Sequence, residues 1–295
     1  MSTFARRSML MTPGNRLERM LKAASLGADA LVFDLEDSVP PEQKPAARST
    51  VARALQQAAD AGKELCVRVN SLGSGHGLAD LQAIPWHLAD SIMIPKVESA
   101  EELLRFEHAL GECNGLEGRN GPIEFVVMLE TPRGIFNALA VTDATERTTA
   151  LFFGSGDYTS AMNARPLPDV LQYPRSVVCA AAGARGIQAI DAAYFLKVKD
   201  ADATREDAVQ ARQFGFAGKV VFHPAQIDVV NEVFTPTADE IREASLIVDA
   251  YEAARAKGLG TLVVEGHFVA IDLVLPARRR LELARRLNLI PGNPV

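Results

Sequence analysis

Short apolar runs alternate with polar, helix-forming stretches along most of this chain. Each run spans four to six residues, ends at a polar residue or a turn, and leads into a stretch with helical composition. The runs begin near positions 8, 30, 65, 92, 125, 150, 186 and 219. Strands and helices that alternate in this way form parallel sheets with right-handed crossovers. Eight such units favour a closed (β/α)8 barrel, or TIM barrel, over an open doubly wound sheet.

The alternation stops after His223. Beyond it, the pattern predicts two helices and an apolar run between them, at about 237–257, 276–287 and 261–264. A barrel has no need of these elements. We therefore expect a catalytic barrel domain over residues 1–230 and a C-terminal helical extension over residues 231–295, which acts as a lid or as an oligomer contact.

Composition narrows the class of protein. The chain has 295 residues, near the usual length of one barrel. Its net charge of −6 and pI of about 5.5 argue against a general nucleic-acid-binding protein, which would carry a basic excess. Three cysteines without a C-x-x-C pair are typical of a reducing compartment. No apolar run approaches the roughly 18–20 residues that span a bilayer, so we expect a cytoplasmic protein without a membrane anchor.

Charged side chains follow most of the expected strands, at the end where barrel enzymes place their catalytic groups. The residues at these positions are Asp34, Glu36, Asp37, Arg68, Lys96, Glu130, Asp157, Asp191 and His223. So many carboxylates would repel one another unless a cation lay among them. Because the candidate ligands are oxygens, with no cluster of Cys or His, Mg²⁺ is the natural candidate and Mn²⁺ the next.

Two of these carboxylates also have simpler interpretations. Glu130 begins a Glu-Thr-Pro segment, which is often a helix start, and Asp157 closes a Gly-Ser-Gly-Asp turn in which Asp commonly caps a helix. That turn lacks the third glycine of a dinucleotide-binding fingerprint, which excludes a Rossmann interpretation. Residue chemistry by itself therefore predicts a barrel with a carboxylate-bound metal and leaves the reaction open.

The same strand ends also carry a more specific resemblance. Segments in order along nearly the whole chain resemble the motifs of the HpcH/HpaI aldolase/citrate lyase family, within the branch of citrate lyase beta subunits and malyl-/citramalyl-CoA lyases. They are Arg7-Ser-Met-Leu-Met-Thr-Pro-Gly-Asn15, Phe33-Asp-Leu-Glu-Asp-Ser-Val39, Val67-Arg-Val-Asn70, Pro95-Lys-Val-Glu98, Leu129-Glu-Thr-Pro132, Phe153-Gly-x-x-Asp157 and Gly218-Lys-x-x-Phe-His-Pro-x-Gln226. Each motif is weak alone, but seven in the same order are strong.

The resemblance implies roles for the strand-end residues. Glu130 and Asp157 would bind Mg²⁺ directly, and Glu36 and Asp37 would hold metal-bound waters and orient the ligands. Arg68 would hydrogen-bond the reacting carbonyl of the substrate. The implied set thus follows several strand ends, with Mg²⁺ as the cofactor and Mn²⁺ as a possible substitute.

The implied reaction is the cleavage of a carbon–carbon bond in a 3-hydroxyacyl-CoA thioester of the citramalyl-, malyl- or citryl-CoA type. The products would be an acyl-CoA and a keto acid. CoA would lie over the N-terminal segment, where Arg16 and Arg19 could contact its phosphates, and Lys96 and His223 would line the substrate site. The resemblance also implies a homo-oligomer, with a trimer as the suggested form.

The chain departs from the family pattern at the general acid that protonates the product enolate. Related lyases supply an Asp in a Gly-x-Met-Ile-Asp stretch that reaches a neighbouring subunit. Counting from Gly266 puts Ala270 at that position, and Asp272 follows two residues later. Either Asp272 serves as the acid or the activity differs. Three alternatives stay open: a citrate lyase beta subunit acting on citryl-acyl-carrier protein, an aldolase for a free hydroxy-keto acid, and a barrel that only binds CoA esters.

Overall fold

The structure is a computed structural model that describes residues 4–113, 116, 121–256, 258, 260–264 and 267–291. The chain divides into two compact units, Met1–Phe234 and Thr235–Val295. The first unit ends at Phe234 rather than at residue 230, because helix α10 (Ile227–Phe234) buries Ile227, Val230, Val233 and Phe234 and packs on the barrel. The two units are described separately.

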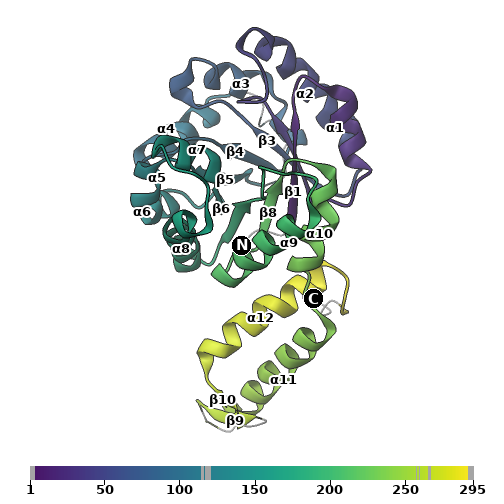
Figure 1. Cartoon of the computed structure of the whole chain (residues 1–295), viewed down its shortest axis with the longest axis vertical. Helices are drawn as coiled ribbons and strands as arrows, with labels where there is room; N and C mark the ends of the chain where they lie inside the picture. Colours follow the sequence, from purple (N-terminus) through teal and green to yellow (C-terminus); the bar gives the residue numbers. More distant parts are fainter. Residues whose placement is uncertain are drawn as a thin grey trace. The chain divides into compact units, whose positions relative to one another are not determined.

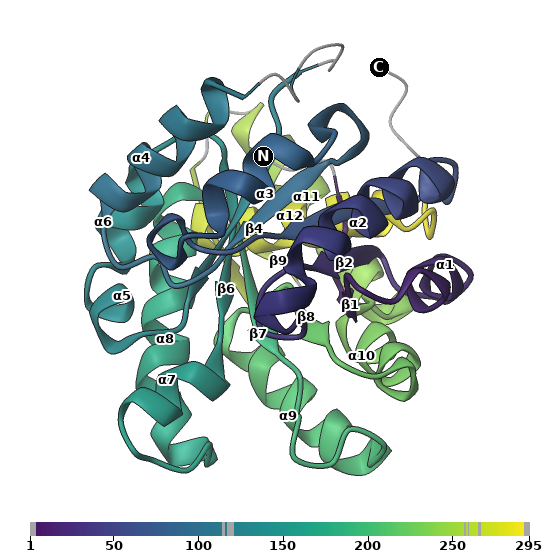
Figure 2. The ribbon, with the colours of Figure 1, turned by 90° about the horizontal axis from the view of Figure 1, so that it is seen from above.

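The first unit is a closed barrel, which confirms the expected (β/α)8 fold. Among the described residues, eight strands pair in parallel and in sequence order, and β1 pairs with β8 to close the ring (Figures 1 and 2). The strands are β1 (Ser8–Pro13), β2 (Ala30–Asp34), β3 (Glu64–Arg68), β4 (Ser91–Ile94), β5 (Glu124–Leu129), β6 (Thr148–Phe153), β7 (Gln188–Ala192) and β8 (Gly218–Val221).

Helices surround the barrel, as Figure 2 shows. Besides α10 they are α1 (Leu17–Ala24), α2 (Lys44–Ala58), α3 (Gly77–Ala83), α4 (Ala100–Gly111), α5 (Pro132–Phe136), α6 (Ala138–Asp143), α7 (Ser155–Ala161), α8 (Pro168–Arg185) and α9 (Ala201–Phe214), with the 3-10 turns η1 (Pro41–Gln43), η2 (Leu72–Ser74), η3 (Trp86–Leu88) and η5 (Pro224–Gln226). We expected α8 to begin near Tyr173. It begins at Pro168, because proline lacks only an N–H that the first helical residue does not use.

Side chains alternate between two apolar layers along each strand. In β2, Val32 points into the barrel core with Met9, whereas Leu31 and Phe33 pack in the layer between strands and helices. Both layers are buried, which explains why the strands read as continuous apolar runs instead of alternating patterns. The barrel interior is therefore packed, and open chemistry is restricted to its ends.

An ionic cluster closes the amino end of the barrel. Arg6, only 1% exposed, donates to both carboxylate oxygens of Glu64 at 2.7 Å and to Glu124 at 2.6 Å. It also donates to Thr149 and Gln188. The Arg6 guanidinium thus ties together strands β3, β5, β6 and β7 at the end opposite the expected active site.

The second unit is a pair of helices with a short two-stranded sheet. Helix α11 (Ala238–Arg255) and helix α12 (Ile271–Arg286) pack through Ala244, Ala277 and Leu281. Strands β9 (Leu262–Val264) and β10 (His267–Val269) are antiparallel. We expected the last helix near Pro276, but it starts at Ile271 and the proline lies inside it. None of the described helices is long and apolar enough to cross a membrane.

Candidate active site

A cluster of charged side chains lies at the carboxyl ends of strands β2 to β6. Contacts or charge interactions connect its members, which follow five successive strands of the barrel. They are Asp34, Glu36 and Asp37 from β2 and its loop, Arg68 from β3, Lys96 after β4, Glu130 after β5 and Asp157 after β6. We call this set the carboxyl-end cluster.

Asp34 fixes the position of Arg68. The two residues lie opposite each other in the β2–β3 register, and Arg68 donates from Nε to Oδ1 at 2.6 Å and from Nη2 to Oδ2 at 2.7 Å. Asp34 also accepts hydrogen bonds from the main-chain N–H groups of Glu36 and Ser38. Burial alone would raise the pKa of Asp34, but the Arg68 guanidinium outweighs it and lowers that pKa. One ionised carboxylate therefore organises both the arginine and the loop after β2.

Arg68 reaches further into the cluster. Its Nη1 lies 3.0 Å from Glu36 Oε2 and 3.8 Å from Asp37 Oδ2. This contact is an ion pair without a hydrogen bond, so the buried Oε2 of Glu36 keeps its accepting capacity. The arginine side chain is only 8% exposed and is held on two sides, so its remaining N–H groups have fixed directions.

Lys96 contacts two parts of the cluster. Its main-chain N–H donates to Glu130 Oε1 at 2.8 Å, and its ammonium donates to Glu36 Oε1 at 2.8 Å and to Asp37 Oδ1 at 3.5 Å. The residue has a φ of 55°, in the left-handed region. Lys96 thus joins the loop after β2 to the carboxylate after β5.

Glu130 is almost completely buried. It is 1% exposed, and its Oε2 has no hydrogen-bond partner among the described residues. A Cβ at Gly154 would lie 2.5 Å from Glu130 Cβ and 2.6 Å from Oε2, so only glycine leaves room for this side chain. Burial raises the pKa of Glu130 to about 8, and the charges of Glu36 and Asp157 add to the shift.

Asp157 lies in the first turn of α7 and is exposed. Gly154 occupies the N-cap position of this helix and no side chain caps it, so the simpler interpretation of Asp157 as an N-cap is wrong. In the same way, Thr131 is the residue that caps α5, where its side chain accepts from Gly134 N–H. The Glu-Thr-Pro segment therefore does begin a helix, through Thr131 and Pro132, and Glu130 is the residue that precedes the cap.

The cluster fits a hard divalent cation. An unpartnered buried oxygen on Glu130, repelled by nearby carboxylates, is stabilised when a positive ion binds beside it. Within the described part of the chain, no three His, Cys, Asp or Glu side chains form a group that could hold a metal ion by themselves. Mg²⁺ is commonly bound by one or two carboxylates and completes its shell with waters and substrate oxygens.

Other expected site residues lie apart from this cluster. Asp191 is fully buried and pairs with Arg175 at 2.8 Å and with Lys219 at 2.6 Å, so it belongs to an internal ion cluster. His223 caps η5, where its Nδ1 accepts from Ala225 N–H at 3.1 Å, which places the proton of the neutral ring on Nε2. Such a histidine can still donate from Nε2.

Two further predicted residues lie outside the cluster. Arg16 is the N-cap residue of α1, in the loop after β1, at the same end of the barrel as the carboxyl-end cluster. Asp272 is exposed in the first turn of α12, in the second unit, and Ala270 is the N-cap of that helix. Gly266, from which the family spacing is counted, lies outside the described residues.

Sequence reasoning did not foresee three supporting roles. Asp34 was expected at the end of its strand, and Gly154 within a family motif, but neither with the role described above. Lys44, a buried lysine behind the loop after β2, was not singled out at all. The Lys44 ammonium donates at 2.7 Å to the carbonyls of Leu35 and Glu36 and to Asn70 Oδ1. Nothing in a single sequence marks a lysine in a helical stretch as a buried support.

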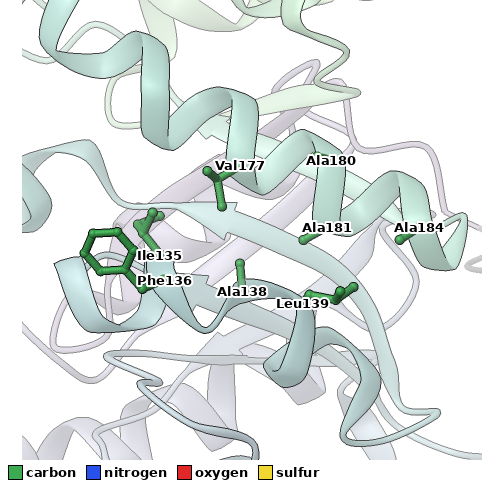
Figure 3. A pocket seen from close by; sticks show the side chains of 8 residues that line it. All are labelled: Ile135, Phe136, Ala138, Leu139, Val177, Ala180, Ala181 and Ala184. Carbon is green, nitrogen blue, oxygen red and sulfur yellow. The ribbon is translucent and has the colours of Figure 1, made fainter.

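The structure also has pockets that are not lined by residues of the carboxyl-end cluster. One of about 290 Å³ lies between α5, α6 and α8. Figure 3 shows that its labelled side chains are all apolar. A second, of about 340 Å³, opens between α8, α9 and the loop after β7. Neither is lined by a residue of the carboxyl-end cluster, so the cluster remains the candidate active site.

Fold and site together define the class: a (β/α)8-barrel enzyme with an acidic candidate active site at the carboxyl ends of its strands. The family model for HpcH/HpaI aldolase/citrate lyase matches residues 7–224. The chain belongs to this family, which confirms the resemblance and the expected lyase class.

Individual relatives agree with this assignment. The citrate lyase subunit beta of Leuconostoc mesenteroides subsp. cremoris is 34% identical over 97% of this chain and 95% of its own length. A (3S)-malyl-CoA thioesterase of Cereibacter sphaeroides (strain ATCC 17025 / ATH 2.4.3) is 34% identical over 95% of each chain. The structure of CitE from Mycobacterium tuberculosis, in complex with magnesium, acetoacetate and coenzyme A, has a TM-score of 0.73 and 27% identity and covers 96% of this chain and 99% of that one.

Proposed function

We propose that this protein is a Mg²⁺-dependent carbon–carbon lyase that cleaves a 3-hydroxyacyl-CoA thioester of the citramalyl-, malyl- or citryl-CoA type into an acyl-CoA and a keto acid. The observation that carries the proposal is the buried, unpartnered Oε2 of Glu130 beside Asp157, within the same cluster as Arg68. The malyl-CoA thioesterase relatives and the CitE complex with magnesium and coenzyme A support the choice of substrate class and ion.

In this proposal Glu130 and Asp157 hold Mg²⁺, and Glu36 and Asp37 accept hydrogen bonds from its waters. The bound ion supplies Lewis-acid polarisation and a template for the oxygens of the departing keto acid. Mn²⁺ prefers the same oxygen ligands and is expected to substitute. Lys96 keeps Glu36 and Asp37 paired while leaving Oε2 of Glu130 open.

Arg68 stabilises the negative charge that appears when the carbon–carbon bond breaks. The bond electrons move into the thioester fragment and form an enolate, whose oxygen needs a fixed hydrogen-bond donor. Asp34 prevents the Arg68 guanidinium from turning away, so its free N–H groups are preorganised. One such donor is worth roughly 3–4 kcal/mol of barrier.

The enolate carbon must then receive a proton. We propose Asp272 as the acid, contributed by the second unit of a neighbouring copy in a homo-oligomer, of which a trimer is the suggested form. Arg16 would bind CoA phosphates, and His223 would donate from Nε2 to the substrate. The trans arrangement predicts that a mixture of inactive Glu130→Gln and inactive Asp272→Asn chains, unfolded and refolded together, regains part of the activity.

The names of the relatives support two alternative reactions. One is the hydrolysis of the thioester, because several relatives are (3S)-malyl-CoA thioesterases. The other is the action of a citrate lyase beta subunit on citryl-acyl-carrier protein, because other relatives are citrate lyase beta subunits. The products separate these cases: cleavage releases a keto acid, hydrolysis releases free CoA, and the third case requires the carrier protein.

The test is a turnover assay of the full chain with Mg²⁺ and malyl-, citramalyl- or citryl-CoA. Released keto acids are trapped with phenylhydrazine and free CoA is detected with a thiol reagent. We expect a keto acid from at least one substrate, loss of activity in EDTA, and loss in Glu130→Gln and Asp157→Asn. Glu101→Gln, at a side chain that is 79% exposed on α4, is the matched control. Full activity in either metal-site variant would refute the metal assignment.

A further inference from the structure

Lys96 has a backbone conformation that lysine rarely adopts. Among the described non-glycine residues, Lys96, Asn163 and Asn288 have a positive φ, at 55°, 52° and 56°. Asparagine tolerates the left-handed region because its short side chain bonds locally, but a lysine there carries a steric cost. A residue keeps such a conformation only where its surroundings impose it, and functional sites are where this is most common.

The left-handed conformation gives Lys96 two contacts in opposite directions. Its N–H points to Oε1 of Glu130, which leaves Oε2 as the open oxygen of that carboxylate. Its side chain returns to the other part of the cluster, where the ammonium donates to Glu36 and approaches Asp37. The Lys96 side chain is 40% exposed, so the ammonium lies in the accessible part of the site.

The two contacts act differently on a divalent cation. The main-chain hydrogen bond aligns Glu130, a proposed ligand, and so favours binding. The ammonium is a positive charge beside Glu36 and Asp37, in the same cluster as Glu130, and like charges in a partly buried site repel strongly. The ammonium therefore opposes the binding of Mg²⁺ while it keeps Glu36 in place.

We propose that Lys96 is a positioning residue that sets the Mg²⁺ affinity of the site, with a backbone N–H that orders Glu130 and an ammonium, beside Glu36 and Asp37, whose positive charge opposes the binding of the ion. This inference rests on the proposed function, because it takes Glu130 as a metal ligand. It assigns Lys96 to the metal site, in addition to the expected contact with substrate.

Three variants at this position separate the two roles. Lys96→Gly keeps the left-handed backbone and its N–H but removes the ammonium. Lys96→Val removes the ammonium and also disfavours the left-handed backbone, because a β-branched residue is disfavoured at positive φ. Lys96→Arg keeps both a long side chain with a positive charge and the backbone of a residue that is not β-branched. Lys22→Met, which removes a lysine in the last turn of α1, controls for the loss of one positive charge.

The measurement is the Mg²⁺ dissociation constant of the full chain by isothermal titration calorimetry, without substrate. We expect Lys96→Gly to bind Mg²⁺ about tenfold tighter than the parent, the change expected from removing one nearby like charge. Lys96→Arg and Lys22→Met should stay within about threefold of the parent. Lys96→Val should bind about tenfold more weakly than Lys96→Gly, because Glu130 loses its alignment.

A residue with only a structural role would weaken Mg²⁺ binding in every variant, so tighter binding by Lys96→Gly is the distinctive result. Unchanged or weaker binding by a folded Lys96→Gly chain, checked by its thermal melt, overturns the proposal. Equal affinities for Lys96→Gly and Lys96→Val overturn the backbone role. If the parent binds Mg²⁺ but cleaves no thioester, the proposed lyase activity fails while the affinities still decide the role of Lys96.

Discussion

We expect Glu130 to make the metal-free protein less stable as the pH rises. Its pKa is raised to about 8 in the folded chain from an ordinary value of 4.5, first by burial and then by Glu36 and Asp157. Between these values the folded state holds a proton that the unfolded state has released, so the free energy of unfolding falls as pH increases. The slope is about 1.4 kcal/mol per pH unit, which gives a loss of roughly 2 kcal/mol between pH 6 and pH 8.

The assay is differential scanning calorimetry in EDTA, on the parent and on Glu130→Gln. For a unit of this size, 2 kcal/mol corresponds to a fall of roughly 4 °C in the melting temperature. We expect the melting temperature of the parent to fall by this amount more than that of the variant between pH 6 and pH 8, because the glutamine side chain of the variant cannot titrate. Saturating Mg²⁺ should remove most of the difference, since the ion favours the ionised carboxylate and stabilises the folded state that binds it. Equal pH dependence of parent and variant in EDTA would refute this account of Glu130.

Three substitutions test other parts of the structure. Gly154→Ala should weaken Mg²⁺ binding by about a hundredfold or abolish it, because the added Cβ would lie 2.5 Å from Glu130; titration calorimetry measures this, and parent-like affinity would contradict the steric argument. Asp34→Asn should lower kcat by about 10² with little change in KM, because Arg68 loses its bidentate partner; a change in KM alone would argue against the preorganised donor. Arg6→Met should lower stability by about 3–5 kcal/mol, because the fully buried carboxylate of Glu64 loses its bidentate arginine, while a chain that still melts cooperatively should retain its Mg²⁺ affinity.

The barrel could be predicted from the sequence because strands buried on both faces are distinct apolar runs. The second strand, expected at 30–33, is Ala30–Asp34 in the structure, and the fifth, expected at 125–129, is Glu124–Leu129. Helix starts were harder to place, because proline occupies the first turn of α8 but an interior position of α12. Proline can occupy either position in a helix, and only tertiary packing decides between them.

The positions of the candidate site residues could be predicted from the ends of the strands. The partners of each side chain, however, depend on whether it faces the barrel core or the surrounding helices. Asp34 continues the inward-facing series of Val32, and it meets Arg68 at the mouth of the barrel. Asp191 is one position out of phase with inward-facing Ile190, so it faces the helices and pairs with Arg175. Counting alternation from the core residues would have removed Asp191 from the expected ring of carboxylates.

The arrangement of strands β5 and β6 explains the spacing of the two motifs that carry the proposed metal ligands. Leu129 pairs with Phe153, so Glu130 and Gly154 are the next residues along neighbouring strands, and the missing side chain of Gly154 is the space that Glu130 occupies. Three residues later, Asp157 in the first turn of α7 adds the second carboxylate near the first. The Gly-x-x-Asp motif is therefore suited to two tasks for one ion: its glycine admits the proposed ligand from the preceding strand, and its aspartate supplies the other. A substitution at either position should act on the same binding constant, and the two effects should not be additive, because each removes part of a single site.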